Sequence, residues 1–276
     1  MIRNVGGLSV MIIRLVAFGL FLALLVAPPA TAQDFQKGLA ALKQADYATA
    51  LKEWRPLAER GHADAQFYMG VLYEYGRGVK KDIVKAVQWY RKAAGNGHDN
   101  AKFQLGLIAL NRGDFASARK EWRPLVRKGH ARALFYMGVM YQYGKGVKED
   151  IVEAVKWYRK AADSGYVTAQ YQLGLLYQHG KGVAQDYAEA AKLIRKAALQ
   201  GNAKAQRLLG GYYGKGLGVP KDFETAFMWL DIGSHKNPNI NEEMRNKFAT
   251  FLTPSQFKNA QYRARICVAT NYKLCD

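Results

Sequence analysis

Histidine is the side chain that most often moves protons in enzymes, and this chain of 276 residues contains five histidines. Three of them, His62, His98 and His130, occupy equivalent positions of a repeated pattern, because each directly follows a glycine in a similar segment. Catalysis requires a nucleophile and its base to converge, whereas equivalent positions of successive repeats are spread along an array. We therefore predict a structural or solvent-exposed role for these three histidines.

Two serine-x-x-lysine elements, Ser117 to Lys120 and Ser255 to Lys258, match one motif of penicillin-recognising enzymes. Neither is accompanied by a Ser-Asp-Asn or a Lys-Thr-Gly element, and a lysine-rich chain contains such matches by chance. The Gly-x-Gly segments are predicted to end helices instead of following strands, so they lack the context of phosphate-binding loops. The sequence therefore predicts that the chain is not an enzyme, and it indicates no cofactor and no metal.

Cys267 and Cys275 are the only cysteines of the chain, and both lie among its last ten residues. No second pair of ligands with zinc-like spacing lies beside them, which argues against a metal site. An oxidising compartment outside the cytoplasm allows such a pair of thiols to form a disulfide. We predict a bridge between the two cysteines, with two free thiols as the alternative.

The amino-terminal segment has the features of an export signal. Arg3 and Arg14 lie before an apolar and glycine-containing run over residues 15–27, and the small residues Ala30-Thr31-Ala32 follow. We predict that residues 1–32 are a signal peptide, cleaved near Ala32, and that the mature protein is periplasmic or secreted. A retained membrane anchor is the alternative, although the apolar run is shorter than the roughly 20 residues of a spanning helix.

The chain is strongly basic, with 41 Lys and Arg against 22 Asp and Glu and a formal charge of +19. Residues 1–32 contain two of the arginines and no acidic residue, so the excess belongs to the mature part. Partners of negative charge are favoured: an acidic protein, an anionic glycan or a membrane surface. Nucleic acid also has negative charge, but the predicted export of the protein argues against it as a partner. Arg91, Arg159 and Arg195 recur at equivalent positions; a solvated outer face is the favoured interpretation, and a basic stripe that attracts a partner is the functional alternative.

The chain contains internal repeats, so the candidate residues above must be positioned by an array of similar units. Residues 46–94 and 114–162 are identical at 35 of 49 positions. A smaller unit begins at Ala65, Ala101, Ala133, Ala169 and Ala205, with spacings of 36, 32, 36 and 36 residues. Periods of this length are typical of stacked helix pairs.

Each unit is predicted to be a helix, a glycine turn and a second helix. Asp82 follows the turn of the first complete unit and is a predicted N-cap, as are its equivalents Asp150, Asp186 and Asp222. A glycine recurs in the middle of each first helix, where it costs about 1 kcal/mol relative to alanine. Close approach of the partner helix explains this cost at five positions: Gly70, Gly106, Gly138, Gly174 and Gly210.

The repeat resembles the Sel-one-like repeat family of the tetratricopeptide superfamily. The resemblance rests on the segment Ala65-Gln66-Phe67-Tyr68-Met69-Gly70 and, after it, on Tyr73, Gly76, Gly78, Val79, Asp82, Ala86 and the segment Trp89 to Ala94. It implies an all-α fold, a right-handed α/α superhelical solenoid of about six helix pairs over residues 33–236. Residues 237–276 are predicted to form a C-terminal helical cap, with Ser255 capping its second helix and the disulfide at its end.

The family resemblance also implies the function class. Its members act as adaptors, assembly factors and regulators by binding proteins, and some exported bacterial members serve the cell envelope. We therefore predict an exported scaffold that binds other macromolecules, most readily a protein. The first alternative is an envelope enzyme or a β-lactam-binding protein, although the cysteine-rich relatives associated with β-lactams have a cysteine pair in each repeat and these repeats have none. The second is a glycan-binding or polysaccharide-assembly subunit.

Alignment with the tetratricopeptide pattern predicts which side chains of the first helices face the concave surface. Tyr75, Tyr143 and His179 lie near helix ends, where they are free to meet a partner. The remaining candidate partner-binding residues repeat so regularly that packing between units is the favoured explanation for them; they are Phe67, Phe103, Phe135 and Tyr171. Tyr75 and Tyr143 are the leading candidates.

Overall fold

The computed structural model describes residues 30–235 and 242–275, in which all regular elements are α-helices. The predicted signal peptide lies outside the described residues except at its last three positions, where α1 begins. The helices are α1 (Ala30–Lys43), α2 (Tyr47–Glu59), α3 (Ala63–Tyr75), α4 (Ile83–Gly95), α5 (Asp99–Asn111), α6 (Phe115–Arg127), α7 (Ala131–Gln142), α8 (Ile151–Asp163), α9 (Val167–His179), α10 (Tyr187–Ala198), α11 (Ala203–Lys215), α12 (Phe223–Ser234), α13 (Glu242–Ala249) and α14 (Pro254–Ala269).

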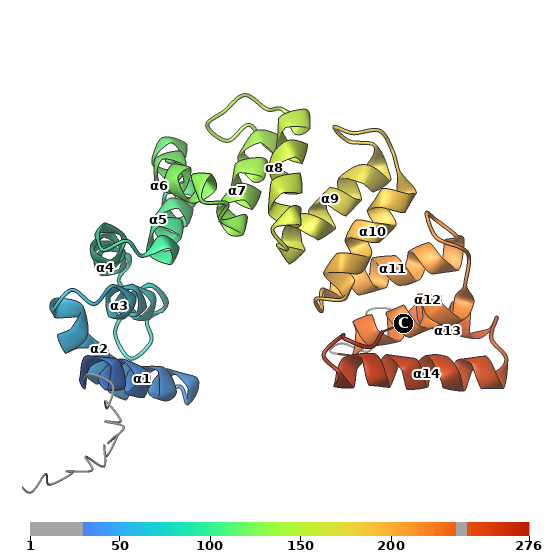
Figure 1. Ribbon diagram of the computed structural model, residues 1–276, viewed down its shortest axis with the longest axis horizontal. Helices are drawn as coiled ribbons and strands as arrows, with labels where there is room; N and C mark the ends of the chain where they lie inside the picture. The colour runs from blue at the N-terminus through green and yellow to red at the C-terminus, as the bar shows by residue number, and fades with distance from the viewer. Residues whose placement is uncertain (1–29, 236–241, 276) are drawn as a thin grey trace, which may run out of the picture.

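The first twelve helices form six hairpins that follow one another around an arch, with α1 at one end and α14 at the other (Figure 1). Each odd-numbered helix up to α11 is the first helix of its hairpin, and each even-numbered helix up to α12 is the second. In the hairpins α3–α4 and α5–α6, the first helix lies toward the inside of the arch and the second toward the outside (Figure 1). We call the faces formed by the first and second helices the inner side and the outer side.

The predicted solenoid of about six helix pairs is confirmed, while the handedness of the superhelix stays a prediction. Each second helix packs on the first helix of the next hairpin. The buried apolar side chains accordingly form a series of clusters along the arch, each built from neighbouring helices. This is the arrangement expected of a repeat protein, in which each unit contacts its neighbours. No helix of the described part of the chain is long and apolar enough to cross a bilayer.

The aspartates after the glycine turns cap the second helices, as predicted. Asp82 Oδ1 accepts hydrogen bonds from the backbone N–H groups of Val84 and Lys85 at 3.0 and 2.9 Å. Gly76 ends the preceding helix with a φ of 68°, a left-handed conformation that favours glycine. Equivalent caps begin three further second helices and are formed by Asp150, Asp186 and Asp222.

The mid-helix glycines allow the two helices of each hairpin to approach closely, which confirms their predicted role. A Cβ atom on Gly106 would lie 2.2 Å from Nε1 of Trp122, a fully buried side chain of α6. The same nitrogen donates a hydrogen bond to the carbonyl oxygen of Phe103 at 3.1 Å, so the indole ring has little freedom to move. The glycines of α3, α7, α9 and α11 meet Tyr90, Tyr158, Ile194 and Leu230 in the same way.

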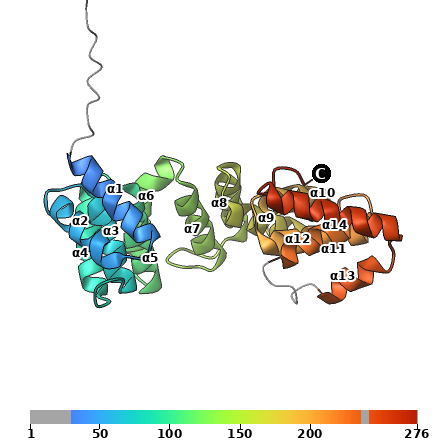
Figure 2. The same ribbon diagram turned by 90° about the horizontal axis from the view of Figure 1, so that it is seen from below.

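The cap helices cover the last hairpin, where α14 packs on α12 (Figure 2). The predicted N-cap of α14, Ser255, is wrong. Thr253 caps this helix in a reciprocal capping box with Gln256, because Pro254 has a fixed φ that suits the first helical position. Ser255 therefore already lies inside the first turn.

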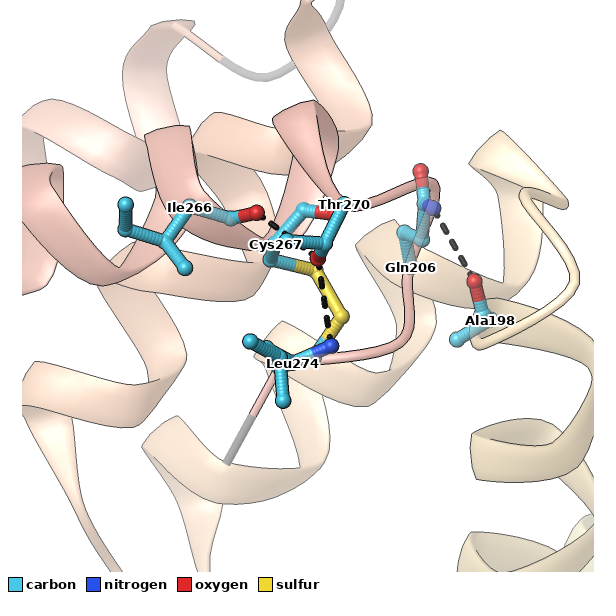
Figure 3. Close-up of a disulfide and its surroundings, with 7 residues drawn as sticks. Ala198, Gln206, Ile266, Cys267, Thr270 and Leu274 are labelled. Carbon is cyan, nitrogen blue, oxygen red and sulfur yellow. Dashed lines mark hydrogen bonds between the residues drawn. A yellow bond between two sulfur atoms is a disulfide. The ribbon is translucent and has the colours of Figure 1, made fainter.

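The disulfide between Cys267 and Cys275 is present, as predicted, with the two Cα atoms 4.5 Å apart. Both cysteines are buried against the last hairpin. Thr270 lies between them and organises the loop, since its hydroxyl donates to the carbonyl oxygen of Ile266 and accepts from the N–H of Leu274 (Figure 3). A disulfide of this kind indicates an oxidising compartment.

Candidate functional site

The repeated histidines are helix caps, which confirms their predicted structural role. Nδ1 of His62, His98 and His130 accepts a hydrogen bond from the backbone N–H of the residue three positions later, at 3.3, 3.1 and 3.3 Å. Asn202 caps α11 through its side-chain oxygen at the same position of its repeat. No cluster of three or more potential metal ligands occurs among residues 30–235 and 242–275.

Two of these capping histidines have lowered pKa values. Burial lowers the pKa of His98 below its ordinary 6.5, against the opposing effects of Asp64 and Asp99. Burial, reinforced by the charge of Arg132, also lowers the pKa of His130. An imidazole that accepts a hydrogen bond at Nδ1 must be unprotonated there. The neutral form of each histidine is therefore the form that stabilises the fold.

We predict that the protein loses stability as the pH falls from 7.5 to 5. The folded-state pKa of His98 and His130 lies below the unfolded value, so their contribution is complete above about pH 6.5 and is lost as protons bind to the unfolded chain first. Urea unfolding at the two pH values measures the difference. The variant H98N/H130N, which copies the asparagine cap of α11, should show a smaller pH dependence. An equal dependence in the parent and the variant would assign the effect to other groups.

Tyr75 and Tyr143 are the most exposed of the predicted partner-binding aromatic residues. Their side chains are 56% and 60% exposed, and they occupy equivalent positions in the two copies of the 68-residue duplication. The guanidinium of Arg77 lies 5.5 Å from the centroid of the Tyr75 ring. His179, at the end of α9, is also exposed.

The predicted row of inner aromatic residues is only partly available to a partner. Phe67, Phe135 and Tyr171 are half-buried, but Phe103 is fully buried, so its predicted binding role is wrong. The guanidinium of Arg132 lies 4.1 Å from the centroid of the Phe103 ring. The regular recurrence of an aromatic residue at this position did not show that Arg132, from the first turn of α7, covers one member of the row.

A groove at the C-terminal end of the inner side has a volume of about 480 Å³. Tyr171, Leu175 and Gln178 of α9 form one wall, and residues of α11 and α13 form the others. Tyr212 of α11 donates a hydrogen bond to Oε1 of Gln178 at 2.7 Å and so ties two consecutive first helices together. Burial raises the pKa of Tyr212, which keeps its hydroxyl protonated for this bond. The repeat pattern predicted that Tyr171 faces this side, but it gave no signal that α13 would close the groove.

The arginines of the predicted basic stripe lie on the second helices. Arg91 and Arg159 are exposed, whereas Arg195 is half-buried. Arg159 donates to the hydroxyl oxygen of Tyr177 at 2.6 Å, so part of the stripe joins consecutive hairpins. Two lysines of the same helices lie over tryptophan rings, Lys92 over Trp89 and Lys160 over Trp157. Whether the stripe contacts a partner stays a prediction.

The comparisons with known proteins agree with this architecture. The family model described as Sel1 repeat matches residues 63–98, 131–166, 167–202 and 203–237, which together make up more than half of the chain. A Sel1 repeat protein from Oxalobacter formigenes has a similar structure, with 29% identity, a TM-score of 0.69, and coverage of 84% of this chain and 99% of that one.

Two Pseudomonas aeruginosa structures share the fold at lower identity. The immunity protein PA5088 is 22% identical with a TM-score of 0.51, and the aligned region covers 80% of this chain and 82% of that one. The immunity protein Pa5087 is 21% identical with a TM-score of 0.50, covering 84% and 82%. A comparison with curated proteins found no significant match. The repeat matches show that the chain belongs to the Sel1 repeat family, whose hairpin arrays are generally non-catalytic scaffolds that bind proteins.

Proposed function

We propose that this protein is an exported scaffold that holds a protein partner against the inner side of its arch in the cell envelope. The observation that carries the proposal is the exposure of Tyr75 and Tyr143, at 56% and 60%, in a chain whose other tyrosines of α3 to α8 are at least half-buried. Tyrosine is enriched at binding hot spots, because it offers a large and rigid contact area with a polar tip.

The duplication supports a role for these two side chains beyond packing. The two copies differ at 14 of 49 positions, so they have diverged, and the helix-terminal tyrosine is the same in both. Burial explains why the core tryptophans Trp54 and Trp122 are the same, since both are fully buried. Burial does not explain why Tyr75 and Tyr143 are the same; exposed valines, Val84 and Val152, are also the same in both copies, so the argument for the tyrosines rests on their residue type and on their place on the first helices.

Export is supported by two independent features. The amino-terminal sequence has the charged, apolar and small-residue regions of a signal peptide. The disulfide between Cys267 and Cys275 fits a compartment outside the cytoplasm. Both features support a periplasmic or secreted location.

The tyrosine pair provides the test of this function. We expect the variant Y75A/Y143A to bind its partner at least 1 kcal/mol more weakly, as found for hot-spot residues, with an unchanged melting temperature. The purified protein is used as bait on the envelope fraction, the captured protein is identified by mass spectrometry, and its affinity for each variant is then measured.

Val84 and Val152 supply a matched control. They are also exposed, at 62% and 52%, and also occupy equivalent positions in the two copies, but they lie on second helices. The variant V84A/V152A should bind as the parent does. If the valine pair weakens binding and the tyrosine pair does not, the partner lies on the outer side and the proposal is wrong.

A further inference from the structure

Charge is unevenly distributed along the first helices. Helix α3 contains two acidic residues and no basic residue, and α9 contains neither Lys, Arg, Asp nor Glu. Helix α11, by contrast, contains three basic residues and no acidic one. These are Lys204, Arg207 and Lys215, and all three line the groove between α9, α11 and α13. The first helices α1, α5 and α7 carry a net charge of at most +1 each, so α11 is the most positive helix of the inner side.

The three cations lie on one stripe of α11, because their spacing of three and eight residues brings them to the same helix face. Gly211 lies within this stripe, and nothing lies within 4 Å of the position that its Cβ would occupy. The glycine thus leaves open space between Arg207 and Lys215. A ligand can therefore approach the backbone of α11 at Gly211 without displacing a side chain.

Within the described residues, none of the three cations has an ion-pair partner, although lysines elsewhere do. Lys128 pairs with Asp99 and Lys156 with Glu153, each at 2.8 Å. The two carboxylates of the groove, Glu242 and Glu243, lie on the wall formed by α13. The groove is consequently polarised, with cations on one wall and carboxylates on another.

Apart from Gln178, the remaining lining is apolar or aromatic. Tyr171 and Leu175 contribute from α9, Leu208 from α11 and Met244 from α13. An anionic ligand that also has apolar side chains fits such a lining better than a polysaccharide does. The leucine and methionine side chains cannot form hydrogen bonds with the hydroxyl groups of a polysaccharide.

We propose that the groove between α9, α11 and α13 binds an acidic peptide segment, with its carboxylates toward Lys204 and Arg207 and an apolar side chain against Leu175 and Leu208. This inference rests on the proposed function and names the chemistry of one part of the partner.

The test uses the full mature protein and a fluorescein-labelled synthetic peptide, Glu-Glu-Leu-Glu-Glu-Leu with an amidated carboxyl end, followed by fluorescence anisotropy. Reversing two charges in K204E/R207E should weaken binding about tenfold, because each exposed pair contributes up to about 1 kcal/mol and is turned into a repulsion. Both side chains are exposed, so the variant is expected to keep the parent's melting temperature.

Lys120 and Arg123 of α6 give a control matched in residue type, spacing and exposure. K120E/R123E changes the net charge by the same amount, and it should alter the affinity less than twofold. Equal weakening by the two variants would show binding to net charge alone and overturn the proposal, as would no weakening by either. The variant E242Q/E243Q should bind the peptide two- to threefold more tightly, because it removes the opposing carboxylates. Weaker binding by this variant would place the peptide elsewhere.

Two further measurements separate the remaining outcomes. An oligogalacturonate of equal charge should displace the peptide poorly, and equal displacement would overturn the assignment to a peptide. Y75A/Y143A should bind the peptide as the parent does, since those tyrosines are not part of the groove. Loss of partner capture in the tyrosine variant and loss of peptide binding in K204E/R207E are therefore independent results.

Discussion

The variant Gly210→Ala is expected to unfold more easily than the parent, by about 1 to 3 kcal/mol, although alanine is the better helix former. A Cβ at this position would lie 2.8 Å from Cγ of Leu230 and 2.9 Å from the carbonyl oxygen of Ala226. Leu230 is fully buried, and the second obstacle is backbone, so neither atom can move without shifting α12 away from α11. Urea unfolding followed by circular dichroism measures the loss.

The adjacent glycine of the same helix is the control. A Cβ on Gly211 meets nothing within 4 Å, so Gly211→Ala should gain about 0.5 to 1 kcal/mol from helix propensity alone. Opposite signs at neighbouring positions are the expected pattern. If both substitutions stabilise the protein, close helix approach is not the reason for the glycine at position 210.

Removing the disulfide is expected to destabilise the C-terminal end by about 2 to 3 kcal/mol, the loop-closure contribution for cysteines separated by 8 residues. The tail after Cys267 packs on the solenoid, since Tyr272 lies against the turn at Gly201 between α10 and α11. Freeing the tail therefore exposes part of the last hairpins. The variant C267A/C275A, compared with the parent by amide hydrogen exchange, measures the change.

The loss should remain local. Exchange should accelerate in α11, α12 and α14 and stay unchanged in α3 to α6, because those hairpins lie at the other end of the arch and each unit is stabilised by its neighbours (Figure 1). The reduced parent should behave as the alanine variant does. Faster exchange in all six hairpins would show that the cap stabilises the whole array, contrary to our expectation.

Much of the fold could be predicted because the same local sequence signals recur in each repeat. Asp82 and its equivalents are N-caps for a reason contained in the chain itself: an aspartate after a glycine turn and before an apolar stripe. The role of the mid-helix glycines could also be predicted, because a glycine that lowers helix stability recurs at the same position of each repeat. The assignment of Ser255 was wrong because three consecutive residues, Thr253, Pro254 and Ser255, allow two cap positions, and the choice depends on the fixed φ of the proline.

The site was less predictable, because it depends on contacts between repeats that are not alike. The sequence placed Phe67 and Phe103 at equivalent positions, but Arg132 covers only the second of them. The groove at α11 depends on α13, which lies outside the repeat and has no counterpart from which its position can be inferred. The exposure of Tyr75 and Tyr143 could be predicted, because a position near the helix end follows from the repeat alone.

The chain of hairpins that pack on their neighbours also determines how the molecule responds to force. Among the described residues, α1 does not pack on α14 (Figure 1). The distance between these two ends of the arch therefore depends on the angles between successive hairpins. In such an array, a small rotation between each pair of neighbouring hairpins adds up to a large displacement at the two ends. If a partner binds to the inner side as proposed, an arch built in this way can adapt to partners of different diameters.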